Sequence, residues 1–342
     1  MKRVVCFGEI MMRLNPKGYL RFVQASEFEA SYAGGEANVA VSLAHFGVNA
    51  AYVTKVPSHE IGQSAVNELR RFGVDTGGIL RGGERLGAYF VEKGASQRAS
   101  KVIYDRSHSA IAEVKPGEFD WDALLAGADW FHFTGITPAV SDSCALVCRE
   151  ALEAAQRRGV RVSCDLNYRK KLWSREKAGK VMAELMPLVE LCIANEEDAA
   201  DVFGIRAEGT DIEKGELSRE GYTSVARQLT GRFGFKKVAI TLRGSISASD
   251  NNWSGMLYDG AAGASVFAPS YAVRIVDRVG GGDSFGAALI YALLEGWENQ
   301  RAINFAVAAS CLKHTVEHDF NLMNLAEVEA LAGGNASGRV QR

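Results

Sequence analysis

The sequence predicts an α/β protein with a mostly parallel sheet covered by helices on both faces, beside a small separate β-sheet. Short apolar segments alternate with amphipathic segments along most of the 342 residues, which is the pattern of a parallel sheet with crossover helices. Residues 11–34 and 86–110 break this rhythm, because both are strand-like and lack a helical pattern. The length suits one large domain or two ordinary ones.

The N-terminal region begins with an apolar segment, Arg3–Gly8, that reads as a buried first strand. A helix is expected at Glu36–Phe46, where alanine, valine and leucine recur at close spacing. Ala50–Val56 is expected to be a strand and Gly62–Phe72 a helix.

From Trp121 onward the alternation becomes regular. The expected strands are Asp129–Phe133, Val160–Cys164, Glu190–Ala194, Lys237–Leu242, Trp253–Tyr258, Ser265–Phe267 and Ala272–Val276. The expected helices are Ser141–Arg158, Ser174–Met186, Arg219–Arg232, Asp283–Glu295 and Asn299–His314. A polar insertion lies near residues 210–218, and the small, polar residues 333–342 are expected at the surface.

The two β blocks predict a lid. Their strand-like pieces are Met12–Asn15, Leu20–Val23, Phe28–Tyr32, Gly87–Glu92 and Lys101–Tyr104. If the blocks pair, the chain divides into a main domain of residues 1–10, 35–85 and 111–342 and a β lid of residues 11–34 and 86–110. A sheet edge with one apolar face invites pairing with a second copy, so we expect a homodimer or higher homo-oligomer through the lid.

Composition and charge exclude several classes of function. The formal net charge is −2, so neither nucleic acid nor an anionic membrane is an expected partner. The sequence has no apolar stretch long enough for a transmembrane helix, and the opening apolar run is too short for a signal peptide. The six cysteines lie in apolar runs without a C-x-x-C pair. Buried, reduced thiols and a cytoplasmic location are therefore expected.

Polar side chains follow four of the predicted strands directly. The segments are Asp165–Arg169, Asn195–Asp198, Arg243–Gly244 and Asp277–Asp283. In an open parallel sheet, ligands bind outside the carboxyl ends of the strands. We therefore expect these four segments to form one site.

The segment around Asp283 is the most informative of the four. Gly280, Gly281 and Gly282 precede this carboxylate, and an apolar helix follows it. Glycines allow a ligand to approach bare N–H groups, and the start of a helix favours negative charge. Such an anion hole suits a phosphate, with Asp283 as a general base for an attacking hydroxyl. The alternative is that Asp283 only caps the helix and the glycines only make a tight turn.

Other phosphate and nucleotide motifs are absent from the sequence. There is no G-x-x-x-x-G-K-[ST] loop and no H-R-D or D-F-G motif. The first strand leads into Phe7-Gly8-Glu9 and not into G-x-G-x-x-G. A nicotinamide dehydrogenase is therefore disfavoured.

Two motifs give the chain a family resemblance. Asp277–Phe285 resembles the D-T-x-G-A-G-D-x-F signature of the ribokinase-like (PfkB) carbohydrate kinases, with Arg278 and Gly281 as departures. Gly34–Ala40, GGEANVA, resembles the N-terminal signature of the same family. Segments such as DLNYRKKLW and DRVGGGDSF are most similar to 2-keto-3-deoxygluconate kinases. The resemblance implies a ribokinase-like fold with a β lid, ATP and Mg²⁺ as cofactors, and a sugar or sugar acid as substrate.

The resemblance also implies which residues bind the substrates. The sugar would contact Gly34, Asn38, Tyr89, Tyr104, Arg106 and Arg169. The two arginines are the expected partners of a substrate carboxylate, since guanidinium offers a planar fork of donors. The nucleotide would be bound by Asn195, Thr241, Arg243 and Gly244. The family's N-x-x-E motif ends here in Asp198, so Asp198 or Glu197 would hold the metal through water.

The reaction that these expectations describe is transfer of the γ-phosphoryl group of ATP to the terminal hydroxyl of 2-keto-3-deoxygluconate, giving the 6-phosphate. Asp283 would accept the proton, and the N–H groups of Gly280, Gly281 and Gly282 would stabilise the transferring group. Fructose and 5-dehydro-2-deoxygluconate stay open as other substrates. A non-catalytic sugar- or nucleotide-binding protein on the same fold is the alternative outside enzymes.

Overall fold

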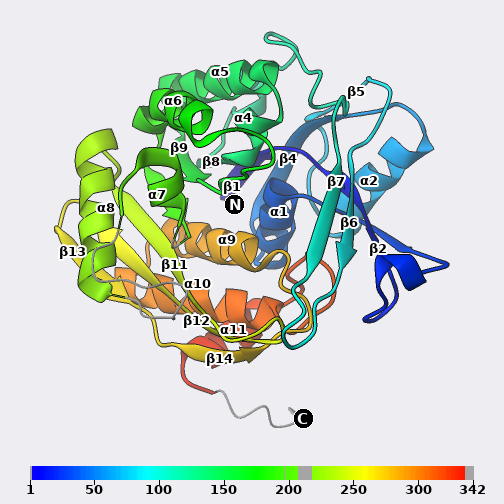
Figure 1. The fold of residues 1–342 in the computed structure, drawn as a ribbon. Coiled ribbons are helices and arrows are strands. Elements are labelled where there is room, and N and C mark those ends of the chain that lie inside the picture. The colour runs from blue at the N-terminus through cyan, green and yellow to red at the C-terminus, as the bar shows by residue number, and fades with distance from the viewer. Residues whose placement is uncertain (1, 196, 207–217, 336–342) are drawn as a thin grey trace.

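A mostly parallel sheet lies at the centre of the computed structural model, which describes residues 2–195, 197–206 and 218–335 (Figure 1). Within these residues the sheet has ten strands. They are β1 (Arg3–Phe7), β4 (Asn49–Val56), β5 (Ile79–Arg81), β8 (Trp130–Thr134), β9 (Arg161–Asp165), β10 (Leu191–Ala194), β11 (Lys237–Ser245), β12 (Asp250–Asp259), β13 (Ala264–Phe267) and β14 (Tyr271–Arg274).

The strand order is β13-β12-β11-β10-β9-β8-β1-β4-β5, and β14 pairs with β12 outside this path. All neighbours from β5 to β11 are parallel, whereas β12 is antiparallel to β11, β13 and β14. The α/β fold class expected from the alternation is thereby confirmed.

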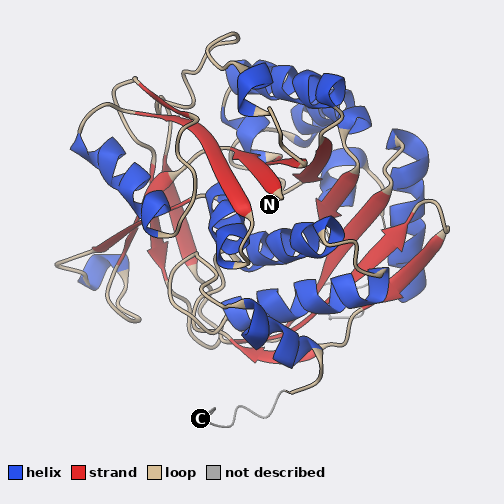
Figure 2. Ribbon diagram, turned by 180° about the vertical axis from the view of Figure 1, so that it is seen from behind, coloured by secondary structure: helices blue, strands red, loops and turns tan. Residues whose placement is uncertain are grey.

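Helices cover both faces of the sheet (Figure 2). One face carries α1 (Gly35–His45), α2 (Glu60–Arg71), α9 (Gly281–Leu294), α10 (Asn299–Lys313) and α11 (Leu325–Ala332). The other carries α3 (Trp121–Leu124), α4 (Ile136–Val140), α5 (Asp142–Arg158), α6 (Arg175–Leu185), α7 (Asp198–Phe203) and α8 (Arg219–Phe233), with the 3₁₀ turn η2 (Met186–Leu188) after α6.

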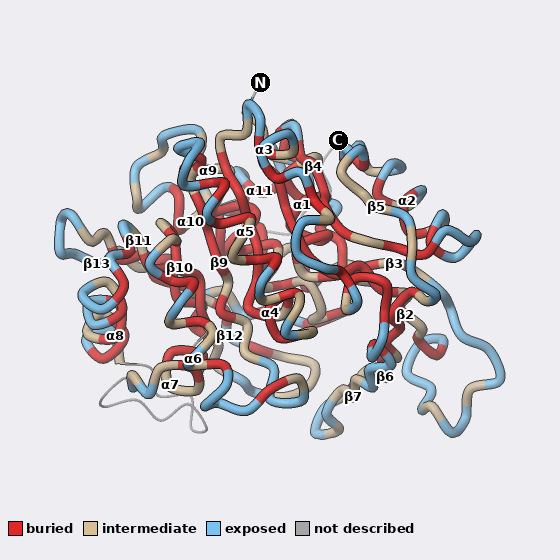
Figure 3. Tube along the Cα trace, turned by 90° about the horizontal axis from the view of Figure 1, so that it is seen from above, coloured by how far each residue is buried: buried red, intermediate tan, exposed pale blue. Residues whose placement is uncertain are grey.

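The central strand β1 shows why both faces must be covered. Val4 and Cys6 pack into one core, and Val5 and Phe7 pack into the other. Successive side chains of a strand point to opposite faces, so an apolar run of this kind is stable only when buried on both sides. Figure 3 shows the resulting buried centre with exposed loops around it.

A second sheet is built from the two blocks that break the α/β rhythm. Its strands are β2 (Met11–Asn15), β3 (Glu29–Ala33), β6 (Ala88–Glu92) and β7 (Lys101–Asp105), in the order β3-β2-β6-β7. The central pair, β2 and β6, is parallel. We call these four strands the small sheet. Leu20–Val23 is not a strand as expected, because it lies in a loop with the short 3₁₀ turn η1 (Phe22–Gln24).

Several short elements were not predicted from the sequence. They are β5, α3, α4, α7 and α11, most of them too short to show a period. The start of α11 does carry a readable signal, because Asn324 and Glu327 form a capping box. The polar insertion expected near residues 210–218 falls almost entirely outside the described residues.

The strand expected at Ala272–Val276 ends earlier, at Arg274, and lies beside the antiparallel β12. It still runs in the same sense as β11, because both strands are antiparallel to β12. The carboxyl ends of β9, β10, β11 and β14 therefore face one edge of the sheet, and this edge carries the candidate site.

The environment of the cysteines agrees with the expectation from the sequence. All six are unpaired and buried. Within the described residues, no helix combines the length and the apolar character needed to cross a bilayer.

Candidate active site

A cleft of about 320 Å³ opens at the carboxyl edge of the sheet, between the small sheet and the start of α9. It brings together most residues that the sequence assigned to a site. Those lining it are Gly34, Asn38, Tyr89, Tyr104, Arg106, Arg169, Asn195, Thr241, Arg243, Gly280, Gly281, Gly282 and Asp283. A larger and more open cavity of about 1490 Å³ adjoins the cleft and shares Tyr104, Arg106, Arg169 and Asn195 with it.

The three glycines before Asp283 differ in what they do. Gly280 caps α9 in the left-handed conformation, with φ of 84°. A Cβ atom on Gly280 would lie 2.0 Å from the carbonyl oxygen of Asp319, and one on Gly281 would lie 2.5 Å from the His314 ring. Gly282 has no heavy atom within 4 Å of such a position. The first two glycines thus permit close packing, and the third leaves open space at the helix start.

The backbone N–H groups of this turn have no partners inside α9, because the first turn of any helix lacks them. The N–H of Gly281 points back to the carbonyl of Arg278 at a long distance of 3.4 Å. The remaining groups, with the positive end of the helix dipole, form a site that favours an anion.

Asp283 lies in the first turn of α9 and accepts a hydrogen bond of 2.7 Å from Asn38 Nδ2. Burial raises the pKa of this carboxyl to about 7, although the Asn38 hydrogen bond acts in the opposite direction. The charge of Asp319 raises the pKa further, whereas that of Arg169 lowers it. A carboxyl with a pKa near neutrality can both accept and release a proton, which is what a general base must do.

A second carboxyl lies near the first. Burial raises the pKa of Asp165 well above its usual range, and the charges of Asp198 and Asp283 raise it further. The positive charge of Arg169 opposes this rise. The cleft therefore concentrates acidic groups around one exposed arginine.

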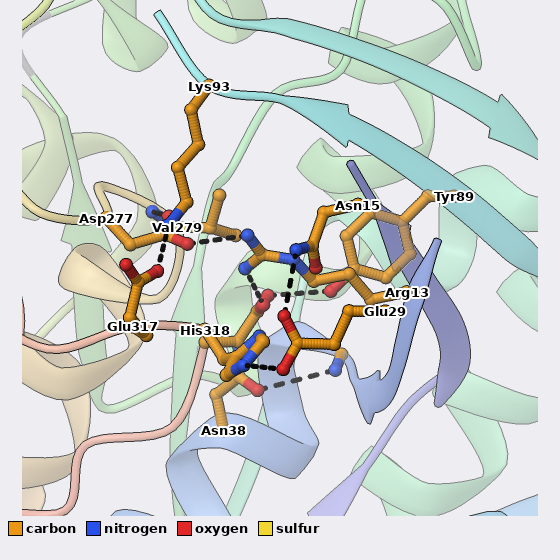
Figure 4. Close-up of polar contacts among 12 residues, drawn as sticks. Arg13, Asn15, Glu29, Asn38, Tyr89, Lys93, Asp277, Val279, Glu317 and His318 are labelled. Carbon is orange, nitrogen blue, oxygen red and sulfur yellow. Dashed lines mark hydrogen bonds and ion pairs between the residues drawn. The ribbon is translucent and has the colours of Figure 1, made fainter. Parts of the chain in front are cut away.

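Two tyrosines of the small sheet form one wall of the cleft. Tyr89 and Tyr104 pair across β6 and β7, with their rings stacked at 6.0 Å between centroids. Tyr89 is almost fully buried and donates a 2.8 Å hydrogen bond to Asp319 Oδ2 (Figure 4). Tyr104 is 38 % exposed. Tyr104 is thus the more accessible surface for a bound ligand.

Gly34 also lines the cleft and is the N-cap of α1. A Cβ atom there would lie 1.9 Å from the carbonyl oxygen of Glu9. Only glycine fits this approach of two backbones, and Asn38 is placed one helical turn further on.

Arg106, which the sequence assigned to a substrate carboxylate, lines the cleft and is paired with an acidic residue of the protein. It is buried, and its Nε and Nη2 both donate to Glu9 Oε2, with Nε at 2.7 Å. The other oxygen of this carboxylate, Glu9 Oε1, accepts a hydrogen bond of 2.6 Å from Ser109 Oγ. Glu9 follows β1 into the protein interior, and a buried carboxylate requires such a partner.

Arg169 has a different environment from Arg106. Its side chain is exposed and lines both cavities. Among the described residues, none forms an ion pair with it. Of the two arginines assigned to a substrate carboxylate, Arg169 is the more exposed, whereas two nitrogens of Arg106 already donate to Glu9.

The residues expected on the nucleotide side are placed less uniformly. Thr241 and Arg243, on β11, line the cleft. Gly244 does not belong to the lining and lies against Asn252 of the neighbouring strand. Arg278, the departure from the family threonine, also lines the cleft and donates to the carbonyl of Ala248 at 2.9 Å.

The two candidate metal residues point in different directions. Asp198 is buried, and its carboxylate accepts the N–H groups of Tyr168 at 3.0 Å and Asn195 at 2.9 Å. Its side chain therefore fixes the loop and does not face the cleft. Glu197 lines the larger cavity. The part of the chain that the structure describes contains no cluster of three or more metal-ligating side chains.

Comparison with known proteins identifies the family. The model of the pfkB family carbohydrate kinases matches residues 1–321. The chain belongs to this family. The protein is therefore a carbohydrate kinase, which sets aside the dehydrogenase and the non-catalytic binding protein.

Relatives of this kinase cover it almost completely. A crystal structure of 2-dehydro-3-deoxygluconokinase from Thermotoga maritima is 50 % identical, with a TM-score of 0.94 over 98 % of this chain and 100 % of that one. The 2-dehydro-3-deoxygalactonokinase of Haloferax volcanii is 34 % identical over 97 % of this chain and 98 % of its own length. The 2-dehydro-3-deoxygluconokinase of Thermoproteus tenax is 29 % identical over 92 % of this chain and 89 % of its own length. These similarities confirm the ribokinase-like architecture.

The strand-end argument already singled out the segment that begins at Asp165, but sequence reasoning gave no role to two other acidic residues that line the cleft of the kinase, Glu9 and Asp319. Glu9 follows the first strand, Asp165 ends β9, and Asp319 lies in the segment after α10. The position of Asp165 at a strand end was a readable signal. Nothing local in the sequence distinguishes Asp319, because it reaches the cleft through a loop with no strand or helix pattern.

The raised pKa of Asp283 predicts a pH-dependent contribution to stability. The folded protein holds a proton that the unfolded chain releases as pH rises from the ordinary pKa of 3.8 to about 7. The contribution of this group to stability is therefore fully present at low pH and is lost over that window. In Asp283→Asn this loss cannot occur. Relative to wild type, the variant should therefore become more stable from about pH 5 to about pH 8, so its free energy of unfolding minus that of wild type should increase.

Urea unfolding of both proteins at the two pH values measures this difference. Asp122→Asn, at an exposed carboxylate remote from the cleft, is the matched control. An Asp283→Asn difference that is the same at both pH values would contradict the raised pKa.

Proposed function

We propose that this kinase transfers the γ-phosphoryl group of ATP to the terminal hydroxyl of 2-keto-3-deoxygluconate, giving the 6-phosphate. The observation that carries the proposal is the position of Asp283. A carboxyl with a pKa of about 7 lies at a helix start with free N–H groups, inside a cleft walled by the small sheet. The general base, Asp283, and the N–H groups that would bind the phosphate thus lie within the same turn of α9.

The substrate class is supported by the relatives. Those at 50 % and 34 % identity are a 2-dehydro-3-deoxygluconokinase and a 2-dehydro-3-deoxygalactonokinase. Both names denote kinases of a keto-deoxy sugar acid, and the two acids are epimers. 2-Keto-3-deoxygalactonate is therefore the second candidate substrate. Fructose and 5-dehydro-2-deoxygluconate are weaker candidates, because the relatives named for them are 28 % identical or less.

In the reaction, Asp283 takes the proton of the terminal hydroxyl as its oxygen forms a bond to the γ-phosphorus. The bond from that phosphorus to the bridging oxygen breaks, and ADP leaves. Burial supplies the basicity of Asp283, while Asn38 fixes its orientation through Nδ2. The N–H groups at Gly280–Gly282 stabilise the charge on the transferring group.

The residues present suit Mg²⁺ in the form that kinases use. Mg²⁺ keeps several waters and needs only one or two carboxylates besides the phosphates. Glu197, which lines a cavity, suits this role better than Asp198, whose oxygens are occupied by backbone N–H groups. When bound, the ion neutralises phosphate charge. Arg243 and Arg278, which line the cleft, add positive charge on the same side.

The small sheet acts as a lid in this proposal. Tyr89 and Tyr104 cover the sugar side of the cleft. Exclusion of water from such a site strengthens its electrostatic interactions and limits hydrolysis of ATP. The six unpaired cysteines fit a reducing cytoplasm.

Asp283→Asn should lower kcat by a factor on the order of 10²–10⁴, because the variant lacks the proton acceptor. Its affinity for the sugar acid should change little, since the amide has the same shape. ADP release with a panel of 2-keto-3-deoxygluconate, 2-keto-3-deoxygalactonate, 5-dehydro-2-deoxygluconate, fructose and ribose measures both the substrate and the loss. Near-normal turnover by the variant, or a preference of wild type for ribose or fructose, would overturn the proposal.

Arg169→Ala should raise KM for the preferred sugar acid by about 10- to 100-fold, because charge-assisted hydrogen bonds contribute about 1.5–3 kcal/mol. The KM for a neutral sugar should change little in this variant. Lys170→Ala is the matched control, since Lys170 lines only the larger cavity. An equal effect on fructose and on the acid would argue against a carboxylate contact.

Arg106→Ala is unsuitable for this test, because it leaves the buried Glu9 without its ion-pair partner.

We also propose that two copies pair through the small sheet. Its strands and loops expose Tyr19, Leu20, Val23, Phe28 and Ile103, with Val23 90 % exposed. Strand β7 is an edge strand, which can pair with a second copy. Val23→Glu should convert a dimer to a monomer in light scattering, because it places a charge in an apolar contact. Leu146→Glu, at an exposed site on α5, is the control. A monomeric wild type would refute the pairing.

A further inference from the structure

Arg13 is a fully buried arginine on β2 of the small sheet, and the mechanism above does not use it. Its Nη1 donates to Asp319 Oδ1 and its Nη2 to Asp277 Oδ2, both at 2.5 Å (Figure 4). The two carboxylates come from different segments, one just before the glycine turn and one after α10. Arg13 therefore joins three separate parts of the chain at one point.

Asp277 connects Arg13 to the glycine turn. Its Oδ1 accepts a hydrogen bond of 3.1 Å from the N–H of Val279, while its Oδ2 accepts the hydrogen bond from Arg13 Nη2. Its backbone carbonyl accepts a hydrogen bond of 3.2 Å from Lys313 Nζ. Val279 directly precedes Gly280, so the orientation of the Asp277 carboxylate fixes the turn that leads into α9.

Asp319 supports the same turn from the other side. The carbonyl oxygen of Asp319 lies 2.0 Å from where a Cβ of Gly280 would be, so the two backbones are in direct contact. Its carboxylate is held by Arg13 through Oδ1 and by Tyr89 through Oδ2 at 2.8 Å. Both donors belong to the small sheet. The segment on which Gly280 rests is thus positioned by that sheet.

The charges of this group balance. Arg13 and Lys313 are fully buried basic residues, and Asp277 and Asp319 are buried acidic ones, so the formal charges of the four cancel, although burial lowers the pKa of Lys313. Burial alone would lower the pKa of Arg13, but Asp319 and Asp277 raise it above its ordinary value, so the arginine stays charged. Removing Arg13 would leave one uncompensated negative charge directly behind a site that must hold phosphate.

Two other ion pairs among the described residues join the small sheet, or the residue just after β6, to the segment after α10, and each has an exposed acidic partner. Lys93 pairs with Glu317, whose side chain is exposed, and Glu29 pairs with His318 at 3.2 Å. Neither pair touches Asp277. These contacts join the same two parts of the chain but do not reach the glycine turn. A substitution in one of these pairs therefore weakens attachment of the small sheet without removing support from the turn.

We propose that Arg13 is a positioning residue that makes docking of the small sheet a condition for an ordered anion hole. With the guanidinium between Asp277 and Asp319, the Val279–Gly282 turn is held in the geometry that presents its N–H groups to the phosphoryl group. Without it the turn loosens, and a kinase with a displaced lid transfers phosphate poorly. The inference rests on the proposed function and adds a link between the sugar lid and the phosphate site.

The test compares Arg13→Met, Arg13→Lys and the control Lys93→Met with wild type. Arg13→Met should lower kcat about 100-fold, because a small misplacement of catalytic groups costs about that much, with a much smaller change in KM for the sugar acid. Arg13→Lys keeps the charge but cannot bridge both carboxylates, so it should show a smaller loss. Lys93→Met should stay within about twofold, since an ion pair near the surface contributes little.

Hydrogen exchange provides a second readout that does not depend on activity. In Arg13→Met, exchange of the Val279–Asp283 amides should accelerate while the amides of β8 and β9 stay protected. If Arg13→Met does not fold, the same local acceleration is expected in Arg13→Lys. Unchanged kcat with unchanged exchange, or acceleration that is uniform over the whole protein, would overturn the inference. A wild type that phosphorylates no sugar acid contradicts the proposed function instead, and the exchange experiment then still decides the role of Arg13.

Discussion

The structure depends on how the chain enters α9. Gly280 turns the backbone into the helix with a positive φ, so that the first N–H groups and the carboxylate of Asp283 face the same cleft. Two negative groups must share this place, because the N–H groups that attract phosphate lie beside the carboxylate of Asp283, and the two anions repel each other. Burial raises the pKa of Asp283 to about 7, which makes its carboxylate a stronger acceptor for the proton of the substrate hydroxyl. Much of the remaining fold supplies the packing that keeps this turn in place.

The fold could be predicted well from the sequence where the signal is periodic. Alternation of apolar and amphipathic segments gave the parallel sheet, and its interruption gave the two blocks of the small sheet. The site could be located because polar residues follow strand ends, and parallel strands deliver those ends to one edge. Asp283 and the glycines lie in one cleft for this reason, whereas Asn38, which lines the same cleft, was expected only from the family resemblance. Short elements such as β5 and α7 were beyond reach, since a few residues show no period.

Two of the assigned side chains have partners inside the protein that no sequence pattern revealed, and for the same physical reason. Arg106 looked like a free partner for a substrate, but its charge is paired with Glu9, which lies 97 positions away in the chain. Asp198 looked like a metal residue, but its oxygens accept two backbone N–H groups of nearby loops. In each case a buried charged group has a partner inside the protein, and the identity of that partner depends on tertiary contacts that no local pattern reveals.

The parallel pairing of β2 with β6 has a consequence for how this fold can form and change. Two parallel neighbours cannot be joined by a tight turn, and the connection between these two contains α1, β4, α2 and β5 of the main domain. The small sheet is therefore not a module that folds alone or can be inserted as one piece of gene. Exchange of this part with a distant homologue would need two coordinated cassettes, one for each block of the small sheet.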